Sequence, residues 1–120
     1  IITEKIDFKF IESDFRDVNY NALGKFNIYC YDAIHEEQHQ YQGVSIAQPA
    51  LDDTYVLIVD DWNFIQVRKG TFNAIKDLGI NIISKIDIRT TQNNTLPKLF
   101  HSHYSDWHNG YFIAVCEKSK

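Results

Sequence analysis

Two apolar runs that end in acidic residues constrain the fold of this chain more than any other feature. The first run, Phe26–Tyr31, stops at Asp32, and the second, residues 55–59, stops at Asp60 and Asp61. Unbroken apolar runs bounded by polar residues are typical of strands buried on both faces, as in parallel sheets covered by helices. Ligands of open α/β sheets bind outside the carboxyl ends of the strands. We therefore expect the three acids to meet at one rim of neighbouring parallel strands.

The rest of the chain alternates between strand and helix patterns. In chain order, it predicts a half-buried strand around Ile6, Phe8 and Phe10, a helix over residues 36–48, a helix over 64–78, a strand over 80–89 and a last strand over 110–116. Pro49 stops the first helix, and Gly79 is placed to cap the second one in the left-handed conformation. This order indicates a parallel α/β sheet with right-handed crossovers. The last two strands have no helix between them, so we expect an antiparallel hairpin at the sheet edge.

Length, charge and cysteine content exclude several classes of protein. We expect residues 1–120 to form a single α/β domain with its own core. A net charge of −4, without any run of Lys or Arg, argues against nucleic acid as a partner. No apolar stretch approaches the ~18 residues that span a bilayer, so we expect no membrane partner. Cys30 and Cys116 fall within apparent strands, which favours two buried free thiols in a cytoplasmic protein, with a single disulfide as the alternative.

One short segment matches a known metal-binding pattern. The segment His35-Glu-Glu-Gln-His39 fits H-E-x-x-H, in which two His one helical turn apart bind zinc and the Glu acts as base. The context argues against a zinc hydrolase, because His35 follows a strand end by three residues and would stand at a helix start. In the zinc proteases the pattern lies within a longer helix. A third ligand would have to come from His101, His103 or His108, and no pattern fixes their positions.

Three segments, taken together, carry a resemblance to a known family. They are Tyr31-Asp-Ala-Ile-His35 with the helix pattern that follows it, Gln48-Pro-Ala-Leu51, and Val59-Asp-Asp-Trp62. Together they resemble class I S-adenosylmethionine-dependent methyltransferases, in particular the branch of macrocin-type sugar O-methyltransferases and cephalosporin-hydroxylase-like proteins. In that branch one strand ends in an Asp-Gly-x-His-like segment, a helix ends in Pro-x-Leu, and the next strand ends in Asp-Asp. The resemblance spans residues 6–118 and implies a Rossmann-like methyltransferase sheet whose last strand is antiparallel.

The same resemblance shows which part of such a domain is missing. These enzymes bind S-adenosylmethionine mainly through a Gly-rich turn after the first strand and an acid after the second, whereas the five glycines here are isolated. We therefore expect an incomplete sheet, without its first two strands and the Gly-rich motif, and a chain that is the C-terminal part of a methyltransferase domain. The start at Ile1 and the lack of any Met agree with this expectation. An exposed sheet edge would then favour a homodimer or a swapped oligomer.

The resemblance also assigns roles to individual acids and to one histidine. Asp32, Asp60 and Asp61 would bind a divalent cation, and Mg²⁺ is the ion that such oxygen ligands suit. The cation would bind a hydroxyl group of a small-molecule or sugar substrate, and Asp32 or His35 would accept its proton before methyl transfer. The alternatives are that Asp60 and Asp61 cap the helix that begins near Asn63, and that His35 is structural.

The remaining assignments concern the cofactor and the substrate. Asp14 and Phe15 fall where relatives contact the adenine ring, with a simple polar turn as the alternative, and Asp32 and Ala33 are also expected to contact the cofactor. Trp62 would line a substrate pocket or, as is commoner for Trp, lie in the core. The resemblance implies a metal-assisted O-methyltransferase that uses S-adenosylmethionine, present here as a fragment with little or no activity alone. A non-catalytic α/β self-association module and, with less support, the zinc hydrolase are the alternatives.

Overall fold

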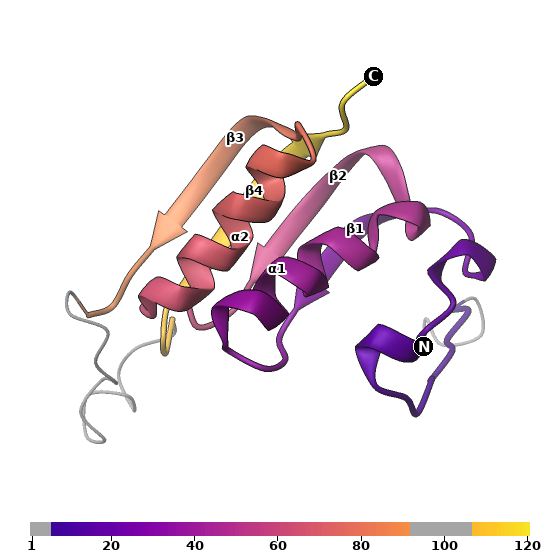
Figure 1. Ribbon diagram of the computed structural model, residues 1–120, viewed down its shortest axis with the longest axis horizontal. Helices are drawn as coiled ribbons and strands as arrows, with labels where there is room; N and C mark the ends of the chain where they lie inside the picture. Colours follow the sequence, from indigo (N-terminus) through magenta and orange to yellow (C-terminus); the bar gives the residue numbers. More distant parts are fainter. Residues whose placement is uncertain (1–5, 92–106) are drawn as a thin grey trace.

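The structure is a computed structural model that describes residues 6–91 and 107–120 (Figure 1). Its main elements, in chain order, are the strand β1 (Phe26–Tyr31), the helix α1 (Glu37–Ile46), the strand β2 (Leu51–Val59), the helix α2 (Ile65–Asp77) and the strands β3 (Asn81–Ile88) and β4 (Tyr111–Glu117). The connections contain the short 3-10 helices η2 (Phe15–Asp17), η3 (Tyr20–Ala22) and η4 (Gln48–Ala50). The predicted helices and the predicted strands after residue 25 are therefore confirmed; β2 begins at Leu51 instead of at residue 55, and the other ends shift by at most two residues.

The helices end where the sequence signals place their ends. Helix α1 stops at Ile46, and Pro49 lies in the short helix η4 that leads into β2. Helix α2 stops at Asp77, and Gly79 has a φ of 64°, the left-handed conformation that glycine adopts without a steric penalty. In the part of the chain that the structure describes, no helix has the length and apolar character that crossing a membrane requires.

The sheet is open and mixed, with the strand order β1-β2-β4-β3. Strands β1 and β2 are parallel, whereas β4 is antiparallel to both β2 and β3. The expected antiparallel pairing of the last two strands at the sheet edge is thus confirmed, with β3 as the edge strand and β4 between β3 and β2. Burial explains the order: every second residue of β4 is buried, while β3 carries Ser84, Lys85 and Asp87, polar residues that suit an edge strand.

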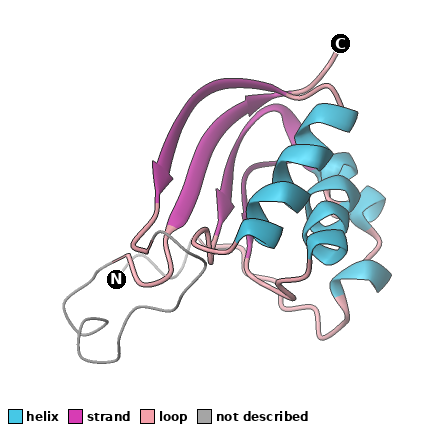
Figure 2. Cartoon of the chain, turned by 60° about the vertical axis from the view of Figure 1, so that its left-hand side comes forward, coloured by secondary structure: helices cyan, strands magenta, loops and turns pink. Residues whose placement is uncertain are grey.

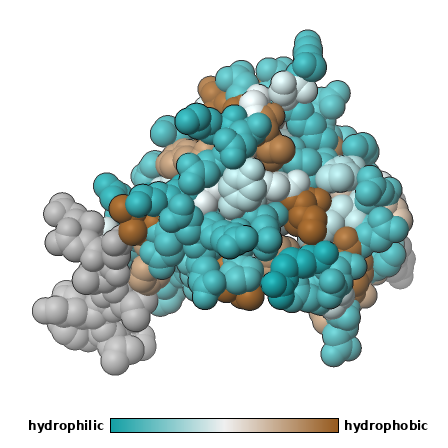
Figure 3. Space-filling model, in the orientation of Figure 1, coloured by the Kyte–Doolittle hydropathy of each residue, from teal (hydrophilic) through white to brown (hydrophobic). Residues whose placement is uncertain are grey.

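Helices α1 and α2 pack side by side on the same face of the sheet (Figures 1 and 2). The core beneath them contains an aromatic cluster of Trp62, Phe72 and Phe112, in which the rings of Trp62 and Phe112 stack with centres 4.4 Å apart. Gly70 allows the two helices to approach closely, because a Cβ atom there would lie 2.3 Å from the carbonyl oxygen of Glu37. The outer surface on this side is mostly hydrophilic (Figure 3).

The opposite face of the sheet is apolar, and neither α1 nor α2 covers it (Figure 2). Two rows of cross-strand neighbours form this face, Ile28, Val56 and Val115 in one row and Cys30, Ile58, Ile113 and Ile86 in the other. Ile28 is 61% exposed and Ile86 57%. The expectation that β1 is buried on both faces is therefore wrong. For the same reason Cys30 is exposed rather than buried, whereas Cys116 is buried as expected, and both thiols are free.

The strand predicted around Ile6, Phe8 and Phe10 is not formed. These residues lie in a segment without regular secondary structure, and their side chains are 62%, 80% and 75% exposed. A strand is stable only when a neighbouring strand satisfies its backbone N–H and C=O groups, and none of the described strands pairs with this segment. Alternation of apolar and polar residues is not sufficient without such a partner.

Candidate functional site

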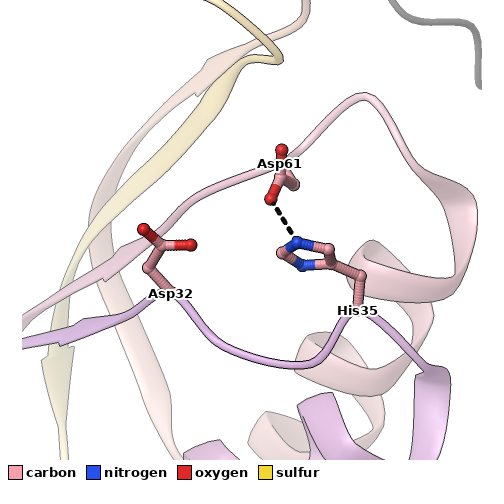
Figure 4. A group of neighbouring side chains, drawn as sticks. All are labelled: Asp32, His35 and Asp61. Carbon is pink, nitrogen blue, oxygen red and sulfur yellow. Dashed lines mark ion pairs between the residues drawn. The ribbon is translucent and has the colours of Figure 1, made fainter.

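Asp32, His35 and Asp61 converge at the carboxyl ends of the parallel strands β1 and β2 (Figure 4). Parallel pairing places Tyr31 opposite Val59, so the residues that follow each strand emerge at the same rim of the sheet. One possible ligand atom from each of the three side chains lies within 4.8 Å of the other two, and His35 Nε2 lies 2.8 Å from Asp61 Oδ2. The expected meeting of the acids that end these two strands is thus confirmed for Asp32 and Asp61.

Asp61 is the buried member of this group, with 7% of its surface exposed. Its backbone is left-handed, with a φ of 55°, and its side chain is held on both sides. Asn109 Nδ2 donates a 2.7 Å hydrogen bond to Asp61 Oδ1, while Oδ2 contacts His35. The proposed helix-capping role does not hold, because α2 has Phe64 as its N-cap residue and no side chain caps it. The Asp61 carboxylate therefore belongs to the rim of the sheet.

Asp60 lies beside the group but is not one of its three ligand residues. Its Oδ1 accepts a 2.8 Å hydrogen bond from the backbone N–H of Asp61, and the hydroxyl group of Tyr111 donates a hydrogen bond to the same side chain. Burial raises the pKa of the Asp60 carboxyl, and the negative charges of Asp61 and Asp32 raise it further, against the effect of these hydrogen bonds. The electrostatic potential at this rim is therefore negative. Asp60 does not cap α2 either.

His35 lies in the loop between β1 and α1, and its side chain is about half exposed. The loop is fixed from beneath by Tyr31, whose buried ring packs against Gly43 and whose hydroxyl group donates a 3.2 Å hydrogen bond to the carbonyl oxygen of His39. In neutral His35, a hydrogen bond from Nε2 to Asp61 Oδ2 places the proton on Nε2. Nδ1 is then the nitrogen that can accept a proton from a substrate.

The H-E-x-x-H segment does not form the arrangement of a zinc protease. Glu36, the N-cap residue of α1, has an extended backbone with a ψ of 146°, so His35 lies outside the helix that contains His39. His39 Nδ1 is 3.0 Å from Glu36 Oε2, and His39 is not part of the group of ligand residues. Of the other candidates for a third ligand, His101 and His103 lie outside the described residues.

The residues assigned to the cofactor lie near the same end of β1. Asp14 is the N-cap residue of η2 and accepts two hydrogen bonds from the guanidinium group of Arg16, at 2.8 and 2.5 Å. This pairing, aided by a backbone hydrogen bond, holds the pKa of the Asp14 carboxyl well below its usual range. The ring of Phe15 meets the ring of Tyr31 edge to face at 5.5 Å. Ala33 is half-buried in the loop that follows Asp32. The turn at 14–17 is thus polar and also adjoins the site.

Trp62 lies in the core and not in a pocket. Its side chain is fully buried, stacks on Phe112 and donates a 2.8 Å hydrogen bond from Nε1 to Asp87 Oδ1. A side chain with no exposed surface cannot contact a substrate in this structure. The core alternative for Trp62 is therefore the one that the structure supports.

Sequence reasoning missed two residues of the site, Asn109 and Tyr111. Both belong to β4 or its entry, and they reach Asp61 and Asp60 because β4 is the direct neighbour of β2. The Asn-Gly pair at 109–110 is a turn signal, and Gly110 has a φ of 86°. That signal indicates a turn before the last strand, but it contains no information about which acid the turn contacts.

We compared the chain with models of known protein families and with curated protein sequences, and neither comparison found a match.

Proposed function

We propose that this chain carries the metal and substrate side of an S-adenosylmethionine-dependent O-methyltransferase that acts on a small molecule or a sugar. The convergence of Asp32, His35 and Asp61 at the carboxyl ends of two adjacent parallel strands is the observation that supports this function most directly. The α/β sheet with an antiparallel last strand agrees with the Rossmann-like methyltransferase sheet that the sequence motifs predict.

The three side chains fit a divalent cation. Two carboxylates and one imidazole are ligands that such ions accept, and the negative potential at the rim attracts a cation. Asp61 is buried and held by Asn109, whereas Asp32 and His35 are exposed, so a substrate oxygen can reach an ion held between them. A cation that takes His35 Nε2 as a ligand requires the imidazole proton to lie on Nδ1, so the hydrogen bond from Nε2 to Asp61 is given up when the cation binds.

The same residues provide a proton acceptor for a hydroxyl substrate. S-adenosylmethionine, when bound, supplies an electrophilic methyl group. An alcohol oxygen is a poor nucleophile until it loses its proton. With a cation on His35 Nε2 the imidazole carries its own proton on Nδ1, so the exposed Asp32 carboxylate is the group that can accept the substrate proton, and His35 Nδ1 could do so only without the cation. Before a cation binds, Asp61 fixes the tautomer and the orientation of His35 through the 2.8 Å contact.

The residues present fit one side of the cofactor. Phe15 offers an aromatic ring beside the end of β1, and Asp14 offers a carboxylate, although Arg16 already pairs with it. Ala33 and Asp32 provide the loop at the strand end. We also propose that the chain alone has little or no activity. We place it in the cytoplasm, because free thiols are stable there.

Calorimetric titration of Mg²⁺ and Mn²⁺ tests the metal site. We expect saturable binding to the wild type and to the control variant Asp53→Asn, which changes an exposed acid far from the rim on β2. Binding should be lost in Asp61→Asn and Asp32→Asn. If the wild type binds neither ion, the proposal fails. Transfer of a labelled methyl group from S-adenosylmethionine to sugars and small alcohols, by the protein expressed from its complete reading frame, then tests the reaction.

A non-catalytic self-association module remains a second candidate, and the uncovered apolar face of the sheet favours it. That face exposes Ile28 and Ile86, and large exposed apolar patches commonly mark contacts with other protein surfaces. Sedimentation of the wild type and of Ile28→Lys with Ile86→Lys tests this candidate. A dimer that dissociates in the double variant, together with an absence of cation binding, would favour it over the enzyme.

A further inference from the structure

The group at the rim contains a nitrogen ligand, which the sequence alone did not place in the metal site. The sequence indicated three carboxylates, whereas in the structure His35 takes the place of Asp60. Asp60 is instead engaged by the backbone N–H of Asp61 and by Tyr111. The site therefore offers one imidazole and two carboxylates to an ion.

We propose that this site binds a first-row transition-metal dication, such as Mn²⁺, in preference to Mg²⁺. The inference rests on the proposed function and specifies its ion. Mg²⁺ prefers oxygen ligands, requires near-ideal octahedral geometry and loses its water ligands reluctantly. Imidazole nitrogen is a preferred ligand of iron, nickel, copper and zinc ions, and affinity for mixed nitrogen and oxygen sites rises along the first row from Mn²⁺, which is its weakest member and therefore the strictest test of the preference over Mg²⁺. Because His35 lies 2.8 Å from Asp61, an ion that Asp61 binds also meets the imidazole.

Asn109 provides an independent indication that the group is built to hold a ligand. It is 7% exposed, and its Nδ2 donates to Asp61 Oδ1. The amide cannot be turned around, since its oxygen would then face a carboxylate oxygen. Its buried Oδ1 consequently has no hydrogen-bond partner among the described residues. Buried acceptors are normally satisfied, and the outer ligands of metal sites commonly hydrogen-bond to the carboxylates and waters around the ion.

Electron paramagnetic resonance of Mn²⁺ tests the inference on the chain itself. Free Mn²⁺ is measured during titration of the protein, and Mg²⁺ is then added as a competitor. Pulsed measurements detect the ¹⁴N nucleus of an imidazole bound directly to Mn²⁺. The test variant is His35→Gln, which keeps a polar side chain with an oxygen atom, and the matched control is His39→Gln, which changes the neighbouring histidine on α1. Thermal unfolding of both variants is measured as the control for correct folding.

We expect the wild type and His39→Gln to bind Mn²⁺ at least about tenfold more tightly than Mg²⁺, with a ¹⁴N signal. In His35→Gln the signal should disappear and the preference for Mn²⁺ should fall towards equality. Asn109→Ala should weaken Mn²⁺ binding by about 10- to 100-fold while keeping the ¹⁴N signal. Equal binding of both ions by the wild type, or a ¹⁴N signal that survives in His35→Gln, overturns this inference alone. Absence of all cation binding by the folded wild type overturns the proposed metal site as well.

Discussion

Replacement of Trp62 by Phe should destabilise the fold strongly and leave the site intact. The substitution removes the hydrogen bond from Nε1 to Asp87, worth about 1.5 kcal/mol because the acceptor is charged but partly hydrated. Loss of part of a fully buried ring adds about 1–2 kcal/mol, since the cavity beside Phe72 closes only partly. The stacking on Phe112 is kept. The total, about 3 kcal/mol, is a large share of the 5–15 kcal/mol typical of a domain.

Urea unfolding followed by far-ultraviolet circular dichroism measures this effect. The midpoint should fall while the slope of the free energy against urea stays constant, and the melting temperature should fall by roughly 10 °C. Trp107→Phe is the control, because Trp107 is 47% exposed, and its change should stay within about 0.5 kcal/mol. A Trp62→Phe variant that loses less than about 1 kcal/mol, or that loses ligand binding at unchanged stability, would refute the assignment of this residue to the core.

Three further predictions follow from packing and burial. Gly70→Ala should destabilise the chain by about 1–2 kcal/mol in urea unfolding, because the contact with backbone outweighs the higher helix propensity of Ala, and Lys69→Ala should be nearly neutral. Burial raises the pKa of Tyr55 from 10.0 to about 12, so the folded state keeps this proton to a higher pH than the unfolded state does. The free energy of unfolding should therefore fall between pH 10 and 12, and it should fall less in Tyr55→Phe. In the native protein at pH 8, a thiol reagent should modify Cys30 much faster than Cys116, which is fully buried and has a pKa raised by burial to about 11; equal rates would contradict the assigned faces of the sheet.

Local patterns were sufficient to predict the helices and most strands of this chain. The helix ends at Pro49 and Gly79 depend on backbone geometry that neighbouring residues alone determine. The parallel pairing of β1 with β2, and with it the approach of Asp32 to Asp61, follows from a strand–helix–strand unit that has few alternatives. The sequence therefore contained the main part of the candidate site.

The missed features depend on contacts between distant segments. Whether the segment with Phe8 and Phe10 forms a strand depends on whether another strand lies beside it. The position of β4 inside the sheet depends on which parts of the chain cover its two apolar faces. Asn109 reaches Asp61 only because of that strand order. The ligand group contains His35 where the sequence predicted Asp60. This difference depends on the directions of the side chains at these two loop positions, which spacing along the chain does not determine.

The left-handed backbone at Asp61 lowers the stability of the fold, whereas the Asp61 side chain is needed for the chemistry of the site. A β-carbon in that conformation costs about 1–2 kcal/mol relative to glycine, with Asp among the residues that tolerate it best. Evolution towards greater thermostability alone would therefore favour glycine here and would erase the carboxylate that joins His35 to Asn109. Asn keeps the shape and the tolerance of this conformation without the charge, which makes Asp61→Asn the cleanest way to remove the chemistry while sparing the loop.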